Sequence, residues 1–376
     1  MMKSGTGTNM ISAKGISEGQ NTANRLTFDI REDMGGGLKA QALFETGLNI
    51  TNPNILTSRA AAAGPQVVAP AAGSIATTDS LSASGDMPTG AYSNGSQNRQ
   101  AYLAVSGGFG EARIGYQRTN LYEQSTYSGY LVGQEQYGGF LHTIGNSTFG
   151  GTRGNAITYI TPKMGAWSAT VQVGSGTDRE EMATDISTGV NGYKSIDQKR
   201  TAFKVDYNAG PLNATYGRTQ YVEKKVQGSN TAVADMFGAV STTAAASTDF
   251  TGTLDQLTGS YEVGALKLTG QYLSGKKDQA ANPATTNLTY KAKVLGGIYT
   301  VGNAGFFAMS GNGTIDTAGT AAHTNDYSST QYGVRYSLSK RTVAYAMHGV
   351  SKDKAQTLVT KAAEGTVTAF GLAHSF

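Results

Sequence analysis

Residues 25–40 read RLTFDIREDMGGGLKA, and this stretch carries the pattern that decides the fold. Leu26, Phe28 and Ile30 alternate with polar neighbours, which places apolar and polar side chains on opposite faces of a β-strand. The run Asp33–Gly37 then supplies the turn-forming residues of a tight reversal before the alternation resumes. The stretch therefore predicts an antiparallel β-hairpin.

The composition of the whole chain agrees with a sheet-rich protein. Of 376 residues, 50 are Gly and 20 are Tyr, only 15% are charged, and none is Cys. Apolar runs stay below the roughly 18 residues that a membrane-spanning helix needs. A mean hydropathy of −0.30 still allows a membrane barrel, because such a barrel shows lipid only every second residue. The net charge of +4 is small and scattered, so a nucleic-acid partner is not expected.

Short turns and long loops alternate along the chain. Seven short turns, each between two alternating segments, lie at 33–37, 107–110, 163–165, 208–211, 263–264, 302–305 and 338–341. Longer stretches rich in Gly, Ser, Thr, Asn and Ala separate these hairpins, at 49–97, 119–153, 175–196, 225–250, 276–286, 315–326 and 353–364. Short periplasmic turns and long extracellular loops are typical of outer-membrane β-barrels. Linkers between separate domains would not recur after every second strand.

The strand count predicts the size of the barrel. Seven hairpins and the alternating segment 366–376 give fifteen strands. Since bacterial single-chain barrels have an even number, a sixteenth strand is expected before Asn24, short or truncated because residues 1–22 alternate poorly. The fold class is therefore all-β, an antiparallel transmembrane barrel of about 16 strands that forms one domain over residues 1–376.

The first residues, Met1–Gly5, lack the apolar segment of a signal peptide. Two interpretations follow: a cytosolic protein, or a numbering that starts after processing or inside a longer chain. The strand count favours the second.

Several segments, taken in order, resemble the general porins of β-proteobacteria. They are Arg25–Ala40, Arg99–Leu103 with Gly108–Gly110, Arg153–Pro162, Leu338–Thr342 and the terminal Gly371–Phe376. The resemblance implies an outer-membrane porin of a Gram-negative bacterium, through which small hydrophilic solutes and ions diffuse passively. It also implies a homotrimer in contact with outer-membrane lipid and lipopolysaccharide, a loop 119–152 folded into the barrel as the constriction, and an assembly signal at Phe376.

Five charged residues are candidates for the pore constriction. The alternation of its strand points Arg25 toward the lumen, and Arg25 matches a basic wall position of these porins. Arg99 and Arg153 match family arginines near long loops. In the strand alternation, however, they fall on the same face as their apolar neighbours, so a bulge or a loop position would have to turn them inward. Glu123 and Glu135 are the acids of the expected inner loop, and acids facing arginines across a narrow pore would select solutes by charge. Exposed loop acids are an equally good interpretation of both.

The strand alternation also points three further basic residues, Arg31, Lys39 and Arg335, toward the lumen, where they could line the channel. Most such charges are simply solvated by the water of the lumen. Tyr116 stands after Gly115 where the family often has Arg. This departure predicts only a weak preference for anions.

The sequence contains no catalytic constellation, so we expect neither enzyme activity nor a cofactor. The four histidines lack metal-ligand spacing, and the stretch Gly270–Lys277, which imitates a phosphate-binding loop, closes a strand instead of opening a helix. Two other hypotheses stay open. One is a non-conducting outer-membrane barrel that presents its loops for surface binding or adhesion. The other is a soluble β-rich adhesin or lectin-like protein, which would not explain Phe376.

Overall fold

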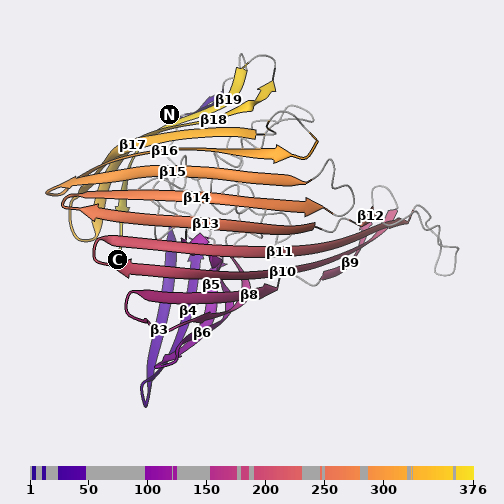
Figure 1. Ribbon diagram of the computed structural model, residues 1–376, viewed down its shortest axis with the longest axis horizontal. Helices are drawn as coiled ribbons and strands as arrows, with labels where there is room; N and C mark the ends of the chain where they lie inside the picture. The colour runs from indigo at the N-terminus through magenta and orange to yellow at the C-terminus, as the bar shows by residue number, and fades with distance from the viewer. Residues whose placement is uncertain are drawn as a thin grey trace.

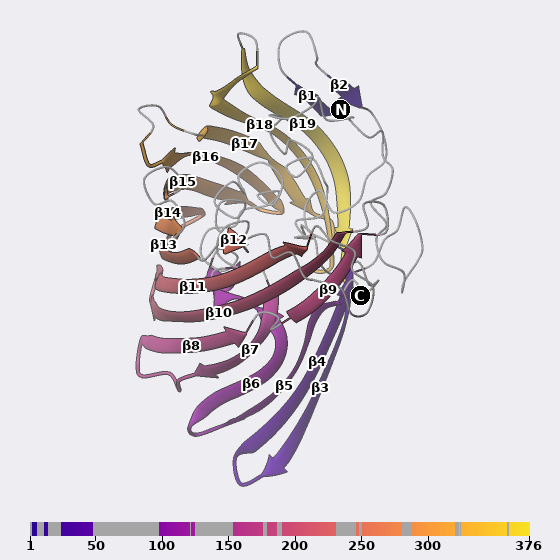
Figure 2. The ribbon, with the colours of Figure 1, turned by 90° about the vertical axis from the view of Figure 1, so that its right-hand side faces the viewer.

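The computed structural model describes residues 2–5, 11–13, 24–47, 98–120, 122–124, 153–175, 179–185, 190–230, 246–247, 250–279, 287–319, 323, 325–358 and 361–376. These residues form almost only antiparallel β-strands, which belong to one sheet. The sheet curves like the wall of a barrel (Figure 2).

Fifteen longer strands run through the described residues. They are β3 (Arg25–Gly35), β4 (Leu38–Gly47), β5 (Asn98–Gly107), β6 (Gly110–Arg118), β7 (Arg153–Ile160), β8 (Trp167–Ser175), β10 (Val190–Ala209), β11 (Leu212–Asn230), β13 (Phe250–Val263), β14 (Leu266–Gln279), β15 (Leu288–Val301), β16 (Ala304–Thr317), β17 (Asn325–Ser337), β18 (Thr342–Leu358) and β19 (Lys361–His374). Four shorter strands are β1 (Met2–Gly5), β2 (Ile11–Ala13), β9 (Arg179–Asp185) and β12 (Ala246–Ser247).

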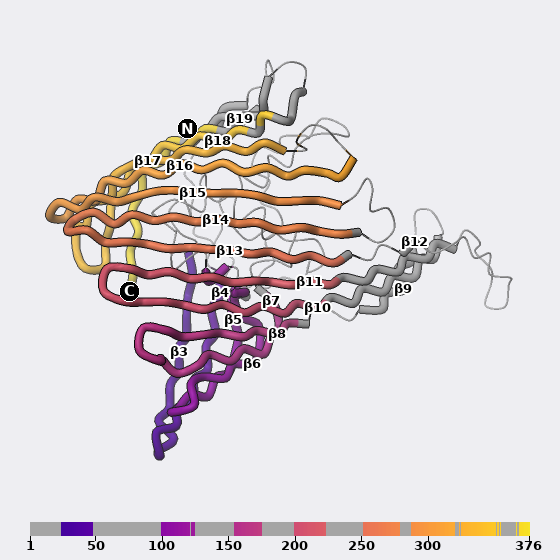
Figure 3. The backbone as a smooth tube through the Cα atoms, viewed as in Figure 1, coloured from indigo at the N-terminus to yellow at the C-terminus, as the bar shows by residue number. Residues whose placement is uncertain are grey.

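Each long strand pairs with the long strands before and after it, so the chain is a meander (Figures 1 and 3). All seven predicted turns join paired strands, which confirms the hairpins. Gly210, Gly264 and Gly302 have φ angles of 55°, 57° and 56° in these turns. A left-handed backbone at these positions suits glycine, and it lets a two-residue turn follow the twist of its strands.

The expected short first strand is β1, which lies beside β19 (Figure 2) and pairs with it from Met2 opposite Val367 to Gly5 opposite Glu364. β1 also pairs with β2. Within the described residues no pairing joins β2 to β3, so the ring of pairings is open at that position.

Several predicted loops are shorter than expected, because strands continue into them. β10 and β11 pair without interruption from Asn191 opposite Asn230 down to their turn, and only residues 359–360 separate β18 from β19. The alternation of apolar and polar residues ends earlier than the backbone pairing does. Backbone hydrogen bonds do not require an apolar face, so these hairpins extend beyond the amphipathic part of the sheet.

The two faces of the sheet differ in burial. On β15, Tyr290, Ala292 and Val294 are buried on the concave inner face, whereas Leu295 and Tyr299 are exposed on the outer face. Large exposed apolar side chains cover the outer face of many other strands as well. This arrangement is the reverse of a soluble sandwich, whose apolar face would be its core.

The inner face is not uniformly polar. Gln117, Thr158 and Gln172 are buried on β6 to β8, but an apolar cluster centred on Leu273 and Phe307 covers the inner face of β13 to β18. The expectation of a polar inner face therefore holds for one side of the wall, and the other side packs as an apolar core.

Candidate functional site

Three arginines surround one carboxylate on the inner face, at the end of β4 that is remote from the β3–β4 turn. Glu45 is 4% exposed. Arg99 Nε donates a hydrogen bond to Glu45 Oε1 at 2.8 Å. Arg25 Nε and Arg118 Nη2 each lie 3.7 Å from Glu45 Oε2. Three guanidinium groups around one carboxylate leave an excess of positive charge at this point.

Arg99 reaches this cluster through a β-bulge. Glu45 pairs with Gln100, but the next residue, Thr46, pairs with Asn98, so Arg99 is an extra residue between two pairs. An extra residue reverses the side to which its side chain points. Arg99 is accordingly 3% exposed, although its parity follows the outward Leu103. Arg25 needs no bulge, because the alternation of side chains along β3 already points it inward.

A short helical turn follows β6 and lies against the inner wall. Residues 120 and 122–124 have helical conformation. Thr119 begins the turn as an N-cap, since its Oγ1 accepts a hydrogen bond from the backbone N–H of Tyr122 at 3.1 Å. The backbone N–H of Asn120 donates to Gln172 Oε1 at 3.2 Å, which attaches the turn to β8. The described start of loop 119–152 therefore folds inward.

The side chain of Gln124 attaches this turn to β11 and β13. Its side-chain Nε2 donates to the carbonyl oxygens of Thr215 at 3.0 Å and of Gln256 at 2.7 Å, and the residue is 2% exposed. Gly217 makes room for it, because a Cβ added there would overlap Gln124 Oε1.

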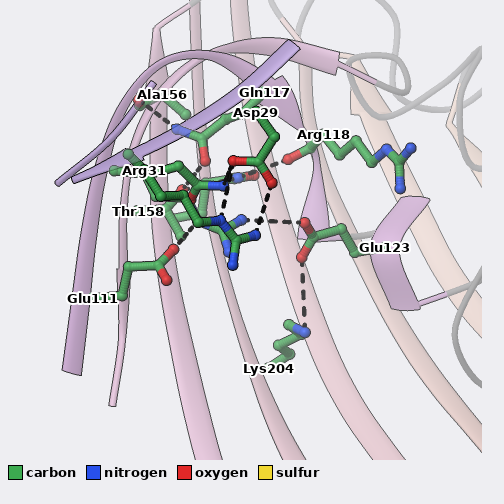
Figure 4. A network of polar contacts seen from close by, with 12 residues as sticks. Asp29, Arg31, Glu111, Gln117, Arg118, Glu123, Ala156, Thr158 and Lys204 are labelled. Carbon is green, nitrogen blue, oxygen red and sulfur yellow. Dashed lines mark hydrogen bonds and ion pairs between the residues drawn. The ribbon is translucent and has the colours of Figure 1, made fainter. Parts of the chain in front are cut away.

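Glu123 connects two basic side chains from strands that are not neighbours. Its carboxylate lies 3.6 Å from Arg113 Nη1 on β6 and 3.8 Å from Lys204 Nζ on β10. Figure 4 shows Glu123 pointing from the turn toward Lys204. Lys204 is also 3.3 Å from Asp206, and Arg113 is hydrogen-bonded to Glu111. The turn is thus held electrostatically as well as by neutral hydrogen bonds.

The three predicted lining residues also lie on the inner face. Arg31 Nη2 is 2.8 Å from Asp29 Oδ2, and the side chain is 70% exposed. Lys39 is exposed and stands opposite Asp33, close to the β3–β4 turn. Arg335 on β17 lies over Gly305, where an added Cβ would be 3.1 Å from Arg335 Nε.

The remaining predicted residues are described only in part. Arg153 is the first residue of β7 and stands opposite Arg118 in the register, but its side chain is outside the described residues, as is all of Glu135. Phe376 is fully exposed, and its ring centroid lies 4.9 Å from that of His374.

Sequence reasoning missed several residues of the site. Glu45 shares the parity of Lys39, and Lys204 stands among the polar residues of an alternating segment, so strand parity could have indicated both. For the contacts of Gln124, no signal in the sequence was available, since they join segments 91 and 132 residues apart.

A sequence profile of the Gram-negative porin family matches residues 3–356. The chain belongs to the Gram-negative porin family. No curated protein matches the sequence significantly.

Solved porins and outer-membrane proteins share the fold of this porin. The anion-selective porin from Comamonas acidovorans is 20% identical with a TM-score of 0.62, and the match covers 95% of this chain and 90% of that one. Outer-membrane-expressed OmpT of Vibrio cholerae is 16% identical with a TM-score of 0.58, covering 100% and 94%. OmpF of Salmonella typhi, solved with daunomycin, is 10% identical with a TM-score of 0.51, covering 99% and 94%.

The family and the fold place this porin in the outer membrane of a Gram-negative bacterium and indicate a channel rather than an enzyme. Its described residues contain no helix long and apolar enough to cross a membrane. In the same part of the chain, no group of three or more His, Asp or Glu side chains is placed to hold a metal ion.

Proposed function

We propose that this porin is a passive channel for small hydrophilic solutes and ions, with a weak preference for anions. The observation that carries the proposal is the charge of the inner wall from β3 to β10, where basic side chains outnumber acidic ones among the described residues. The basic ones are Arg25, Arg31, Lys39, Arg99, Arg113, Arg118, Arg200 and Lys204, and the acidic ones are Asp29, Asp33, Glu45, Glu111, Glu123 and Asp206. The anion selectivity named for the Comamonas acidovorans porin supports the same sign.

Selection by this wall depends on charge more than on fit. Solutes cross without an energy source, and the inward turn narrows the space that they cross. A small positive excess, screened over about 10 Å at 0.1 M salt, favours anions roughly two- to tenfold. Arg153 and Glu135 belong to the proposed constriction together with Arg25, Arg99 and Glu123.

The proposed assembly is a homotrimer that contacts through an uncharged part of the outer face. A shallow apolar groove on β3 to β6 is lined by Phe28, Ile30, Phe44, Leu103 and Ile114, among others. A variant with cysteines at both Phe28 and Leu103 has two thiols per chain, and under oxidation it is expected to cross-link copies of the chain into trimers. Cross-links that form only from strands elsewhere would refute this interface.

A planar bilayer with a salt gradient tests the channel itself. We expect stepwise openings and a reversal potential with the sign of anion permeation. Insertion without conductance would refute the channel and favour a barrel that presents its loops for binding. A reversal potential of the opposite sign would refute the anion preference alone.

A further inference from the structure

Two large polar side chains face the lumen on the wall across from β3 to β6. Arg335 on β17 and Tyr345 on β18 stand directly opposite each other in the register, and both are partly buried on the inner face. Strands β17 and β18 lie on the other side of the curved sheet from β3 to β6 (Figures 1 and 2). The pair is close to the short turn 338–341, which places it on the periplasmic side. It is therefore separate from the arginines around Glu45.

Glycines on the two flanking strands let both side chains lie flat against the wall. Arg335 extends over Gly305 on β16, where an added Cβ would be 3.1 Å from Arg335 Nε and 3.2 Å from its Cγ. Tyr345 extends the other way, over Gly371 on β19, where an added Cβ would overlap the ring and hydroxyl group of Tyr345. The two polar ends therefore point away from each other along one row of the sheet.

The rows on either side of this pair form a shallow floor of small, uncharged side chains. All of them are partly buried on the inner face. On the side of the short turn they are Ser337, Val343 and Ala373, and on the other side they are Gly333 and Ala369. An apolar body can lie on this floor between the two polar ends.

The polar ends of both side chains are available to a ligand. Within the described part of the chain, Arg335 makes no ion pair or hydrogen bond, and neither does the hydroxyl group of Tyr345. The inner residues next to Arg335 on β16 and β18 are uncharged, namely Gly305, Phe307, Val343 and Met347. A guanidinium group on such a wall binds a carboxylate through two parallel hydrogen bonds.

We propose that Arg335 and Tyr345 bind an aromatic carboxylate that carries a hydrogen-bonding group at the far end of its ring. Arg335 donates to the carboxylate, the ring lies on the floor of small side chains, and the hydroxyl group of Tyr345 bonds to the far substituent. This inference rests on the proposed channel, because it names a class of solute that the channel binds on its way through the lumen.

The distance between the two polar ends sets the length of the ligand. Arg335 Nε lies over β16 and the Tyr345 hydroxyl group lies over β19, so three strand spacings, about 14 Å along the wall, separate them. A hydrogen bond of about 2.8 Å at each end leaves about 8–9 Å for the ligand. The concave curvature of the sheet shortens this span, so a single ring with substituents at opposite ends fills it. A small carboxylate without a ring reaches only one end.

The test measures the binding of para-hydroxybenzoate to the full-length porin in detergent micelles, by ligand-observed NMR titration. Three related probes each change one feature. Benzoate lacks the far hydroxyl group, ortho-hydroxybenzoate carries it beside the carboxylate, and para-hydroxybenzyl alcohol lacks the carboxylate.

Two variants remove one polar end each. R335Q removes the guanidinium group, and Y345F removes the hydroxyl group but keeps the ring. K267Q is the matched control, because Lys267 on β14 also lies on the inner face near a short turn, 3.1 Å from Glu262. It removes one positive charge from the same end of the barrel without touching the pair.

The expected result is that para-hydroxybenzoate binds more tightly than the other three probes. Its affinity should fall about tenfold in R335Q and about fivefold in Y345F, which brings it to the affinity of benzoate. Benzoate should bind equally to the wild type and Y345F, since it does not reach the hydroxyl group of Tyr345. K267Q should bind every probe like the wild type.

Equal binding of para-hydroxybenzoate to the wild type and R335Q would overturn the proposal. Equal affinity for the ortho and para isomers would overturn it as well, because the far hydroxyl group would then make no contact. R335K keeps the charge but not the planar fork, so its affinity should lie between those of the wild type and R335Q. Wild-type affinity in both R335K and Y345F, two variants that change little of the packing, would also contradict the site.

Single-channel recording separates this inference from the channel proposal. Binding in micelles is read without current, so its result stands whatever the bilayer experiment shows. In the bilayer, para-hydroxybenzoate should add brief closures to the wild type and fewer to R335Q. A porin that conducts but shows neither these closures nor binding would refute the site and leave the channel in place.

Discussion

Replacing Gly217 by Ala is expected to loosen the inward turn from the barrel wall. Gly217 lies on the inner face of β11, directly under the side-chain amide of Gln124, and a Cβ there would occupy the position of Gln124 Oε1. Gln124 is buried and its amide donates to two carbonyl oxygens, so a shift of the amide away from the added methyl group breaks those hydrogen bonds. The added methyl group therefore displaces the amide and leaves the strand pairing of β11 intact.

The magnitude follows from the two hydrogen bonds that the amide donates, to Thr215 O at 3.0 Å and to Gln256 O at 2.7 Å. Each such bond contributes about 0.5–1.5 kcal/mol net, so losing both destabilises the anchored turn by about 1–3 kcal/mol. The ratio of anchored to detached turn falls roughly 5- to 150-fold. Glu123 still holds the turn through Arg113 and Lys204, so detachment is transient.

Single-channel recording detects this change as new current noise or additional conductance levels in G217A. Gln124→Ala removes the same bonds without altering β11 and is expected to give the same noise. Gly259→Ala is the matched control, because Gly259 is also a strand glycine and an added Cβ there meets only Asn213 O, at 3.2 Å. Wild-type noise in both G217A and Q124A would refute the anchoring of the turn by Gln124.

Four further predictions concern single residues. Glu45→Gln leaves three arginines without their shared carboxylate, so the reversal potential should shift toward anions and the buried cluster should lose about 3–5 kcal/mol of stability in a denaturant titration. An unchanged reversal potential would contradict the place given to this cluster in the pore. Glu123→Gln should raise the anion preference at about 0.1 M salt but hardly at about 1 M, since screening shortens from about 10 Å to about 3 Å. Deleting Phe376 should reduce the amount of assembled porin in outer-membrane fractions, and full assembly would contradict an assembly signal there. The hydrogen bond with Asp316 raises the pKa of His323, so the NMR titration midpoint of His323 should lie above 6.5 and return toward that value in Asp316→Asn. Because the raised pKa belongs to the protonated imidazole, the ion pair between His323 and Asp316 is present at lower pH. It is lost as the pH rises through the raised pKa.

Strand periodicity made much of this fold predictable. The kind of alternation seen at Leu26, Phe28 and Ile30 recurs at each of the seven hairpins, and six of their seven turns contain glycine. Because the side-chain period of a strand is two, the same alternation assigns faces, and it placed Arg25 correctly on the inner side. Loop lengths were less predictable, since backbone pairing continues beyond the amphipathic part of strands such as β10 and β18.

The sequence by itself thus determined the hairpins, their order and the two faces of the wall, because each depends on residues within one or two strands. Only the tertiary structure decided which charges meet. The bulge that turns Arg99 inward is a property of two paired strands, and it is invisible in the parity of one. The contact of Glu123 with both Arg113 and Lys204 requires strands β6 and β10 to curve toward a turn that lies between them, and only the curvature of the whole sheet produces that arrangement.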